Sequence, residues 1–134
     1  MKKAIYFSLM VLCMVFVAAC SSDSPGKAAK KYASYMQSGE YEKFVDGFYF
    51  EGEASTEDVD RTKQMLLSMI QEKGAKEMEQ KGGLKEIEVV SEELSEDKKT
   101  AKVVLKEVYG NGESNENTVD MILVDGTWKM LMKK

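Results

Sequence analysis

Residues 119–132 read Val-Asp-Met-Ile-Leu-Val-Asp-Gly-Thr-Trp-Lys-Met-Leu-Met, and this stretch decides the fold. Its two apolar runs flank Asp125-Gly126, a dipeptide typical of a two-residue β-hairpin turn. That turn places three apolar pairs on one face of the hairpin: Leu123 with Trp128, Met121 with Met130, and Val119 with Met132. The chain is therefore predicted to end in an antiparallel hairpin with one buried face.

Two further segments with alternating apolar residues precede this hairpin. Ile87 and Val89 mark one strand, and Ala101, Val103 and Leu105 mark the next. Pairing Val89 with Val103 and Leu105 with Val119 brings all of these residues to one face, provided that the loop around Asn111-Gly112 has three or five residues. The pattern predicts a curved four-stranded antiparallel meander.

Three helical segments are predicted before the sheet. The first begins at Ser24-Pro25, a Ser N-cap followed by Pro, and stops at Gly39. The second carries an apolar stripe from Tyr41 to Tyr49, and the third runs from Ser55 or Thr56 towards Gly82-Gly83. The buried face expected for the third helix comprises Val59, Thr62, Leu66, Met69 and Ile70, with Met65 alongside. Helices followed by strands indicate an α+β fold with three helices on one face of the sheet, in a single domain over residues 25–134.

Residues 1–19 have the plan of a secretory signal, with Lys2-Lys3 before an apolar run that ends in small residues. Val17-Ala18-Ala19-Cys20 resembles a bacterial lipobox, which predicts cleavage between Ala19 and Cys20 and attachment of lipid, palmitate included, to Cys20. Residues 20–24 would then be a short tether. Ser21 resembles the residue that directs lipoproteins to the outer membrane. The alternatives are a transmembrane helix, for which the run is short, and an ordinary signal peptide.

Composition limits the possible functions. Loss of Lys2 and Lys3 with the signal leaves 17 basic against 23 acidic residues, a formal charge of −6, which argues against a nucleic-acid partner. The chain has no His, and both of its Cys residues, Cys13 and Cys20, precede the predicted domain. Because the predicted domain has neither His nor Cys, we expect neither a metal site nor a cofactor. The membrane is the expected partner, through the lipid on Cys20, together with a small molecule or an envelope protein.

Four sequence features carry a resemblance to a known family: Ala28-Ala29-Lys30-Lys31-Tyr32, Ser38-Gly39-Glu40-Tyr41, Gly82-Gly83-Leu84-Lys85 and Val124-Asp125-Gly126-Thr127-Trp128-Lys129-Met130. With the order of elements, they resemble small bacterial lipoproteins of the domain-of-unknown-function family 4878, also described as lumazine-binding-like, within the nuclear-transport-factor-2-like (NTF2-like) superfamily. The resemblance implies a cone-shaped, cystatin-like domain. Superfamily enzymes place a carboxylate base in the cone, but no motif here matches one, so no catalytic residue is assigned.

Strand pairing predicts one polar group at the end of the apolar face, formed by Lys85, Glu107 and Asn117. It would mark the mouth of a cone with aromatic walls: Tyr32, Tyr35, Tyr49 and Trp128. The alternative is that the three residues lie at the solvated end of the sheet.

Three functions remain open. The preferred one is a non-enzymatic lipoprotein that binds a small molecule or a protein. The second is an isomerase or dehydratase that uses Glu107. The third is an assembly module, with a filled cone and a docking patch on the outer face around Val90, Val104 and Ile122.

Overall fold

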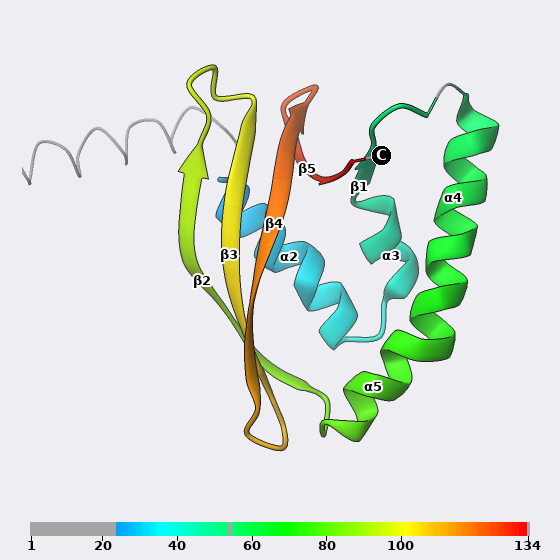
Figure 1. Cartoon of the computed structure of the whole chain (residues 1–134), viewed down its shortest axis with the longest axis vertical. Helices are drawn as coiled ribbons and strands as arrows, with labels where there is room; N and C mark the ends of the chain where they lie inside the picture. The colour runs from blue at the N-terminus through cyan, green and yellow to red at the C-terminus, as the bar shows by residue number, and fades with distance from the viewer. Residues whose placement is uncertain (1–23, 54, 134) are drawn as a thin grey trace, which may run out of the picture.

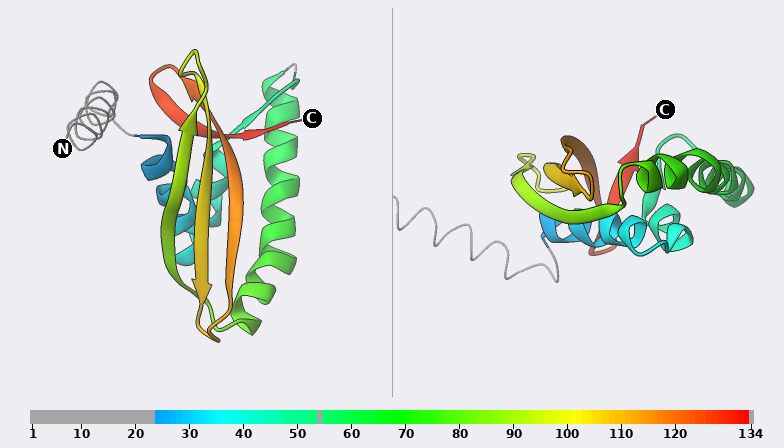
Figure 2. Two further views of the ribbon diagram at one scale, coloured as in Figure 1. Left: turned by 60° about the vertical axis from the view of Figure 1, so that its left-hand side comes forward. Right: turned by 90° about the horizontal axis from the view of Figure 1, so that it is seen from below.

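A curved five-stranded sheet with helices along one face forms the domain in the computed structural model, which describes residues 24–53 and 55–133 (Figures 1 and 2). The strands are β1 (Phe48–Phe50), β2 (Leu84–Leu94), β3 (Thr100–Tyr109), β4 (Ser114–Val124) and β5 (Thr127–Met132), in the spatial order β1-β5-β4-β3-β2. The helices are α2 (Pro25–Gln37), α3 (Tyr41–Asp46), α4 (Thr56–Met69), the π-helical turn η1 (Ile70–Gly74) and α5 (Ala75–Gln80). The predicted signal segment and Cys20 lie outside the described residues.

Helix α2 begins and ends where the sequence predicts. Ser24 is the N-cap, and its hydroxyl accepts a hydrogen bond from the backbone N–H of Lys27 at 3.1 Å. At the other end Gly39 has φ +79°, and the backbone N–H of Glu40 bonds to the carbonyl of Tyr35 at 2.8 Å, as in a Schellman motif. The helix packs on the sheet through three small buried residues, Ala28, Ala29 and Ala33. Their size lets the helix approach the strands closely.

The core lies between α2 and one face of the sheet. Its fully buried side chains are Val103 and Leu105 of β3 and Met121 of β4. Trp128 and Met130 of β5 complete it. All five were predicted to share the inner face, and that prediction is confirmed.

The second predicted helix is wrong at its C-terminal end. Helix α3 stops at Asp46, and Phe48–Phe50 form a strand, β1, that pairs in parallel with β5. The sheet is therefore five-stranded and mixed, not a four-stranded antiparallel meander. The spacing of Phe48 and Tyr49 also fits a helix, but β5 offers an unpaired edge to which β1 adds. Phe50 consequently pairs with Met132.

The third predicted helix begins correctly at the N-cap Ser55, whose hydroxyl accepts from the backbone N–H of Asp58, but its buried face is only partly confirmed. The helix continues through the π turn η1 into α5. Of the predicted face, Ile70 is buried, whereas Val59, Thr62 and Leu66 are half-buried. Met65 and Met69 are 63% and 59% exposed. Figure 1 shows the reason: α4 stands beyond α3, away from the sheet. None of the helices within residues 24–53 and 55–133 has the length and apolar character needed to cross a bilayer.

The register of the final hairpin is confirmed for its first two apolar pairs. Asp125 and Gly126 have φ +50° and +78°, the left-handed conformation of a type I′ turn, and Val124 pairs with Thr127. The recorded β4–β5 pairs end at Met121 with Met130. The predicted pair of Val119 with Met132 is absent, because β4 and β5 are no longer paired beyond that point, and Met132 pairs only with Phe50 of β1, on the other edge of β5.

The β3–β4 loop has the predicted odd length, but the register differs by two residues. The backbone N–H of Tyr109 bonds to the carbonyl of Glu113 at 2.8 Å, which leaves three residues, 110–112, in the loop. Leu105 lies opposite Asn117, not opposite Val119. Because a shift of two residues preserves which face each side chain occupies, the predicted inner face survives.

The β2–β3 pairing shows the same two-residue difference. Val89 pairs with Leu105, not with Val103, and an irregularity follows between Val89 and Ser91. The extra residue there is Val90, which is 49% exposed. A bulge of this kind bends a strand and increases its twist.

Two glycine-containing turns, the one after α5 and the β3–β4 loop, contact each other at one end of the sheet. Gly82 and Gly83 end α5 at φ +85° and +80°, and the backbone N–H of Gly83 bonds to the carbonyl of Met78 at 2.8 Å. The β3–β4 loop docks on this turn, since the N–H of Gly110 bonds to the carbonyl of Gly83 at 2.9 Å. A Cβ on Gly110 would overlap the carbonyl oxygen of Gly82. The corner closes the end of the fold where the polar group was predicted.

Candidate functional site

The candidate site is a cavity of about 460 Å³ between the inner face of the sheet and the helices. Its walls come from α2, α3, β1, the η1–α5 segment and strands β2 to β5. Most of the lining is apolar: Ala29, Ala33, Met36, Phe44, Phe48, Met78, Leu84, Leu105, Val119, Met130 and Leu131. A volume of this size is within the range of small-molecule sites.

The cavity extends to the place where β4 and β5 separate. Asp120 and Leu131 line it there, directly after the last recorded β4–β5 pair. At this point β5 pairs with β1 along its other edge, from Met130 to Met132. Phe48 of β1, the strand that the sequence missed, also lines the cavity.

A polar cluster lies at the corner end of the cavity. Oε2 of Glu107 accepts hydrogen bonds from the Tyr109 hydroxyl at 3.0 Å and from Nδ2 of Asn117 at 3.2 Å. Glu107 and Tyr109 both line the cavity, and they point the same way because they are two residues apart in β3. Nζ of Lys81 lies 4.9 Å from the centroid of the Tyr109 ring, a cation–π contact.

Burial raises the pKa of the Tyr109 hydroxyl above its usual value, and the hydrogen bond to Glu107 adds to the effect. Ionised tyrosine beside a carboxylate would place two like charges 3.0 Å apart. Tyr109 therefore stays a hydrogen-bond donor at neutral pH, and it holds the carboxylate of Glu107 in place.

The predicted contact of Glu107 with Asn117 is thus present, although their backbones are not opposite each other. Asn115 occupies the opposite position, and Asn117 reaches Glu107 diagonally across the strands. Lys85 does not join the group: Ile87 is the β2 residue opposite Glu107. The carbonyl of Lys85 accepts from Nε2 of Gln37 at 2.9 Å, on the exposed side of the corner.

None of the four predicted aromatic wall residues lines this cavity. The Tyr32 hydroxyl donates to the carbonyl of Trp128 at 2.7 Å, and Trp128 is 4% exposed, so this pair belongs to the packed core. Tyr35 packs near Tyr32 on α2, with their ring centroids 6.4 Å apart. Tyr49 points to the opposite face of the sheet and is 40% exposed.

The aromatic side chains in the cavity wall are instead Phe44, Phe48 and Tyr109. Phe44 and Phe48 pack edge to face with their centroids 5.3 Å apart. Tyr109 could have been found from the sequence, because strand alternation alone puts it on the same face as Glu107. The place of Phe48 depends on β1, which local pattern did not reveal.

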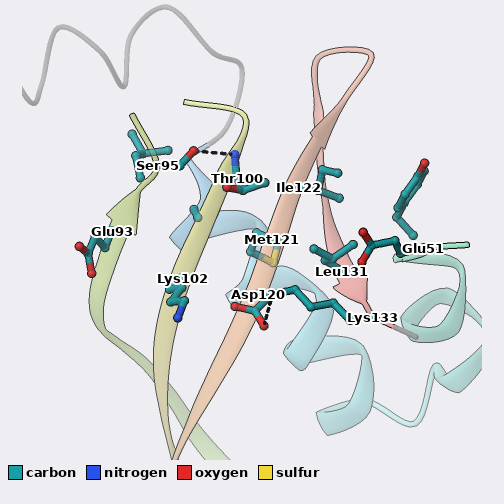
Figure 3. A pocket seen from close by; sticks show the side chains of 13 residues that line it. Glu51, Glu93, Ser95, Thr100, Lys102, Asp120, Met121, Ile122, Leu131 and Lys133 are labelled. Carbon is teal, nitrogen blue, oxygen red and sulfur yellow. Dashed lines mark hydrogen bonds and ion pairs between the residues drawn. The ribbon is translucent and has the colours of Figure 1, made fainter. Parts of the chain in front are cut away.

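A second hollow, of about 610 Å³, lies on the helix-free face of the sheet (Figure 3). Its charged residues come from β2, β3 and β4 and from the positions directly after β1 and β5: Glu93, Lys102, Asp120, Glu51 and Lys133. The ion pair of Lys133 with Asp120 is long, at 3.9 Å, and half exposed. Acidic and basic groups are mixed here, so the hollow favours no ligand charge.

Within the described part of the chain, no group of three or more acidic, Cys or His side chains is arranged to hold a metal ion.

Comparison with known proteins agrees with this architecture. The family model described as "Domain of unknown function (DUF4878)" matches residues 18–131. The chain belongs to the DUF4878 family. No curated protein sequence matches this DUF4878 chain.

One solved structure shows that the DUF4878 domain has an NTF2-like fold. It is similar to a crystal structure from Campylobacter jejuni described as a "putative NTF2-like transpeptidase", with a TM-score of 0.71, 20% identity, and coverage of 83% of this chain and 100% of the other. The intermembrane space region of the chloroplast protein ARC6 also matches, with a TM-score of 0.41, 15% identity, and coverage of 80% and 92%. The first likeness establishes an NTF2-like α+β fold for this chain.

Proposed function

We propose that this DUF4878 protein is a lipid-anchored protein of the bacterial cell envelope, and that its cavity binds a small molecule without chemical conversion. The observation that carries the binding proposal is the apolar cavity of about 460 Å³ with one polar corner. Small-molecule sites combine such a lining with a few fixed polar groups, which set the orientation of the ligand. Glu107, fixed by two hydrogen bonds, is the orienting group here.

The lipid anchor is supported by sequence alone. Cleavage before Cys20 leaves only residues 21–23 ahead of the α2 N-cap, Ser24. Three extended residues span about 10 Å, so the domain would lie next to the membrane surface. Ser21 favours the outer membrane.

Native mass spectrometry of the full-length protein, purified from its source membrane, tests both parts. An intact mass equal to acylated residues 20–134 supports the anchor, and a chain that begins elsewhere without lipid refutes it. A retained small molecule supports the binding function. A lipidated protein that carries nothing, and that takes up nothing when membrane extract is added back, contradicts it.

A cavity-filling variant locates the retained molecule. Met78→Trp enlarges a side chain that lines the cavity from α5 and should abolish retention. Met65→Trp makes the same change on the exposed side of α4, where the residue is 63% exposed, and should leave retention unchanged. Equal retention by both variants would place the molecule outside the cavity.

An acid–base enzyme of the isomerase or dehydratase kind is the second candidate, because Glu107 and Tyr109 are adjacent in the cavity. Its weakness is that the tyrosine O–H is used by Glu107 itself and is not directed at a substrate oxygen. Incubation of the protein with excess recovered ligand separates the two functions. A changed mass or isomer composition supports the enzyme, and an unchanged ligand supports a binding protein.

The transpeptidase named for the Campylobacter jejuni structure is not part of this proposal. Transpeptidation through an acyl-enzyme needs a nucleophile such as Ser, Cys or Thr beside a general base. The described lining of the cavity holds Thr118 but neither Ser nor Cys, and the whole sequence lacks His, the commonest general base.

The assembly module has less support. It predicts a cone filled by its own side chains, whereas the cavity is open. On its expected outer docking patch, Val90 is 49% exposed, but Val104 and Ile122 are half-buried.

A further inference from the structure

We infer that the cavity selects an organic cation, namely an amine or a quaternary ammonium group on an apolar body of a few carbon atoms or one ring. This inference rests on the proposed binding function and adds the chemical class of the ligand. It comes from the charges on the cavity wall, from the partners of those charges, and from the side chains around them.

The charges on the wall have one sign. The acidic residues among the described residues that line the cavity are Glu107 and Asp120, and none of the lining residues is Lys or Arg. The Asp120 carboxylate lies towards the helix-free face, where it pairs with Lys133, so the charge that faces a ligand in the cavity is that of Glu107. This carboxylate would repel an anionic ligand and attract a cation. In an apolar surrounding these interactions are stronger than in bulk water.

Glu107 lacks a cation of its own. Its two hydrogen-bond donors, the Tyr109 hydroxyl and the Asn117 amide, are neutral, and no ion pair to Glu107 is present in the described residues. Both donors bond to Oε2, so Oε1 remains available to a donor from a ligand. A partly buried carboxylate gains most from a partner that brings a compensating charge and an N–H group.

Two lysines contact residues of the cavity lining without forming an ion pair with Glu107. Nζ of Lys81 lies over the Tyr109 ring, and Lys81 is not part of the cavity lining. Nζ of Lys133 is 3.9 Å from Asp120, where both side chains are substantially exposed, so water screens that pair. Neither lysine neutralises Glu107 in the described arrangement.

The remaining wall suits the apolar body of such a ligand. Phe44 and Phe48 supply aromatic surface, which attracts cations as well as hydrocarbon. Met36, Met78 and Met130 are flexible and polarisable, and they adapt to bodies of different shape. The cavity should therefore discriminate between ligands by their charge more than by their shape.

Three probes of matched shape test the selection: 4-phenylbutylamine as the cation, 4-phenylbutanol as the neutral molecule and 4-phenylbutyrate as the anion. Each is titrated calorimetrically into the full-length lipidated protein in dodecyl maltoside micelles, with the heat of titration into protein-free micelles subtracted. We expect the amine to bind at least about tenfold more tightly than the alcohol. The acid should bind more weakly than the alcohol.

Glu107→Gln is the decisive variant, because the amide keeps the size and hydrogen-bonding ability of the side chain but not its charge. It should reduce amine affinity about tenfold, to the level of the alcohol, and leave alcohol affinity unchanged. The matched control is Glu116→Gln: this exposed β4 residue lies opposite Lys106, away from the cavity lining, and its substitution should alter no affinity.

The outcomes separate this inference from the function on which it rests. If the alcohol binds but the amine has no advantage, the cation class is wrong while a binding cavity stands. If the amine advantage survives in Glu107→Gln, the assignment to Glu107 is wrong. If none of the three probes binds the wild-type protein, the cavity does not bind such molecules, and both proposals fail. Alcohol binding by the variant shows that its cavity is still folded.

Discussion

Replacing Gly47 with Ala should destabilise the domain, although its backbone conformation suits alanine well. Gly47 is the C-cap of α3, with φ −76° and ψ −4°. An added Cβ would lie 2.5 and 2.6 Å from two ring carbons of Tyr32, far inside van der Waals contact. The effect of the substitution therefore depends on whether the ring or the backbone can move.

Both partners of this contact are held in place. The Tyr32 hydroxyl is hydrogen-bonded to the carbonyl of Trp128 at 2.7 Å, which fixes the far end of the ring. The carbonyl of Gly47 accepts a hydrogen bond from the backbone N–H of Met130 at 2.8 Å, which ties this junction to β5. Relief of the overlap must stretch one of these bonds or displace α2 from the sheet.

The expected size follows from two opposing effects. Overpacking of a well-packed core costs about 1–3 kcal/mol. Alanine also reduces the backbone entropy of the unfolded chain, which stabilises the fold by about 0.4–1 kcal/mol, because the negative φ at this position suits alanine. We expect a net loss of about 1–2 kcal/mol in the free energy of unfolding, with a fall in Tm of about 4–8 °C for each kcal/mol.

Guanidinium unfolding of the full-length protein, followed by the fluorescence of its one tryptophan, buried Trp128, measures this change. Gly74→Ala is the matched control, since its φ is −60° and its Cβ would meet only ordinary contact at 3.9 Å. That control should stabilise the protein. In a Tyr32→Ala background, Gly47→Ala should no longer destabilise. Unchanged or increased stability of Gly47→Ala in the wild-type background would refute the reasoning.

Three further predictions concern other contacts. The raised pKa of Tyr109 means that, above about pH 10, the folded state keeps the hydroxyl proton while the unfolded chain loses it. The free energy of unfolding should therefore fall as pH rises through the tyrosine range. In stability measurements from pH 8 to 12, Tyr109→Phe should make this fall less steep. Glu92→Ala should lower the free energy of unfolding in guanidinium by about 1 kcal/mol, because Oε2 of Glu92 accepts a hydrogen bond from the N–H of Gly26 at 2.7 Å in the first turn of α2. Equal stability of the variant would show that water replaces this hydrogen bond. Gly126→Ala should cost about 1–2 kcal/mol, because φ is +78° there, and thermal unfolding that matches wild type would contradict the type I′ turn.

Glu92 contacts α2 although it lies beside Glu93 near the end of β2. Its carboxylate accepts a hydrogen bond at the helix N-terminus, 66 residues earlier. A Cβ on Gly26 would overlap this carboxylate, so glycine there permits the close approach.

Signals that act within a few residues were correctly interpreted from sequence. Ser24 and Ser55 each accept a backbone N–H three residues later, and Gly39 ends its helix in the left-handed conformation. Asp125-Gly126 forms the expected turn. These features need no distant partner, because a side chain or a turn satisfies backbone groups that are close in the chain.

Features that need a distant partner were missed. Phe48–Phe50 satisfy a helical spacing equally well, and only the open edge of β5, about 80 residues later, makes them a strand. The apolar spacing of α4 predicted burial of Met65 and Met69, but the helix packs beyond α3 and leaves both exposed. Amphipathic pattern shows which face of a helix can be buried, and tertiary packing determines whether it is.

By itself the sequence determined both ends of α2, the start of α4, the terminal hairpin and the inward face of β3, and with it the direction of Glu107. Strand alternation with a period of two suffices for this, since register errors of two residues leave every face unchanged. Only the tertiary structure decided that Asn117 reaches Glu107 diagonally and not from the opposite position, that Phe48 enters the cavity, and that Tyr49 leaves it. Those choices depend on which strands pair and where they separate, and long-range hydrogen bonds and packing fix both.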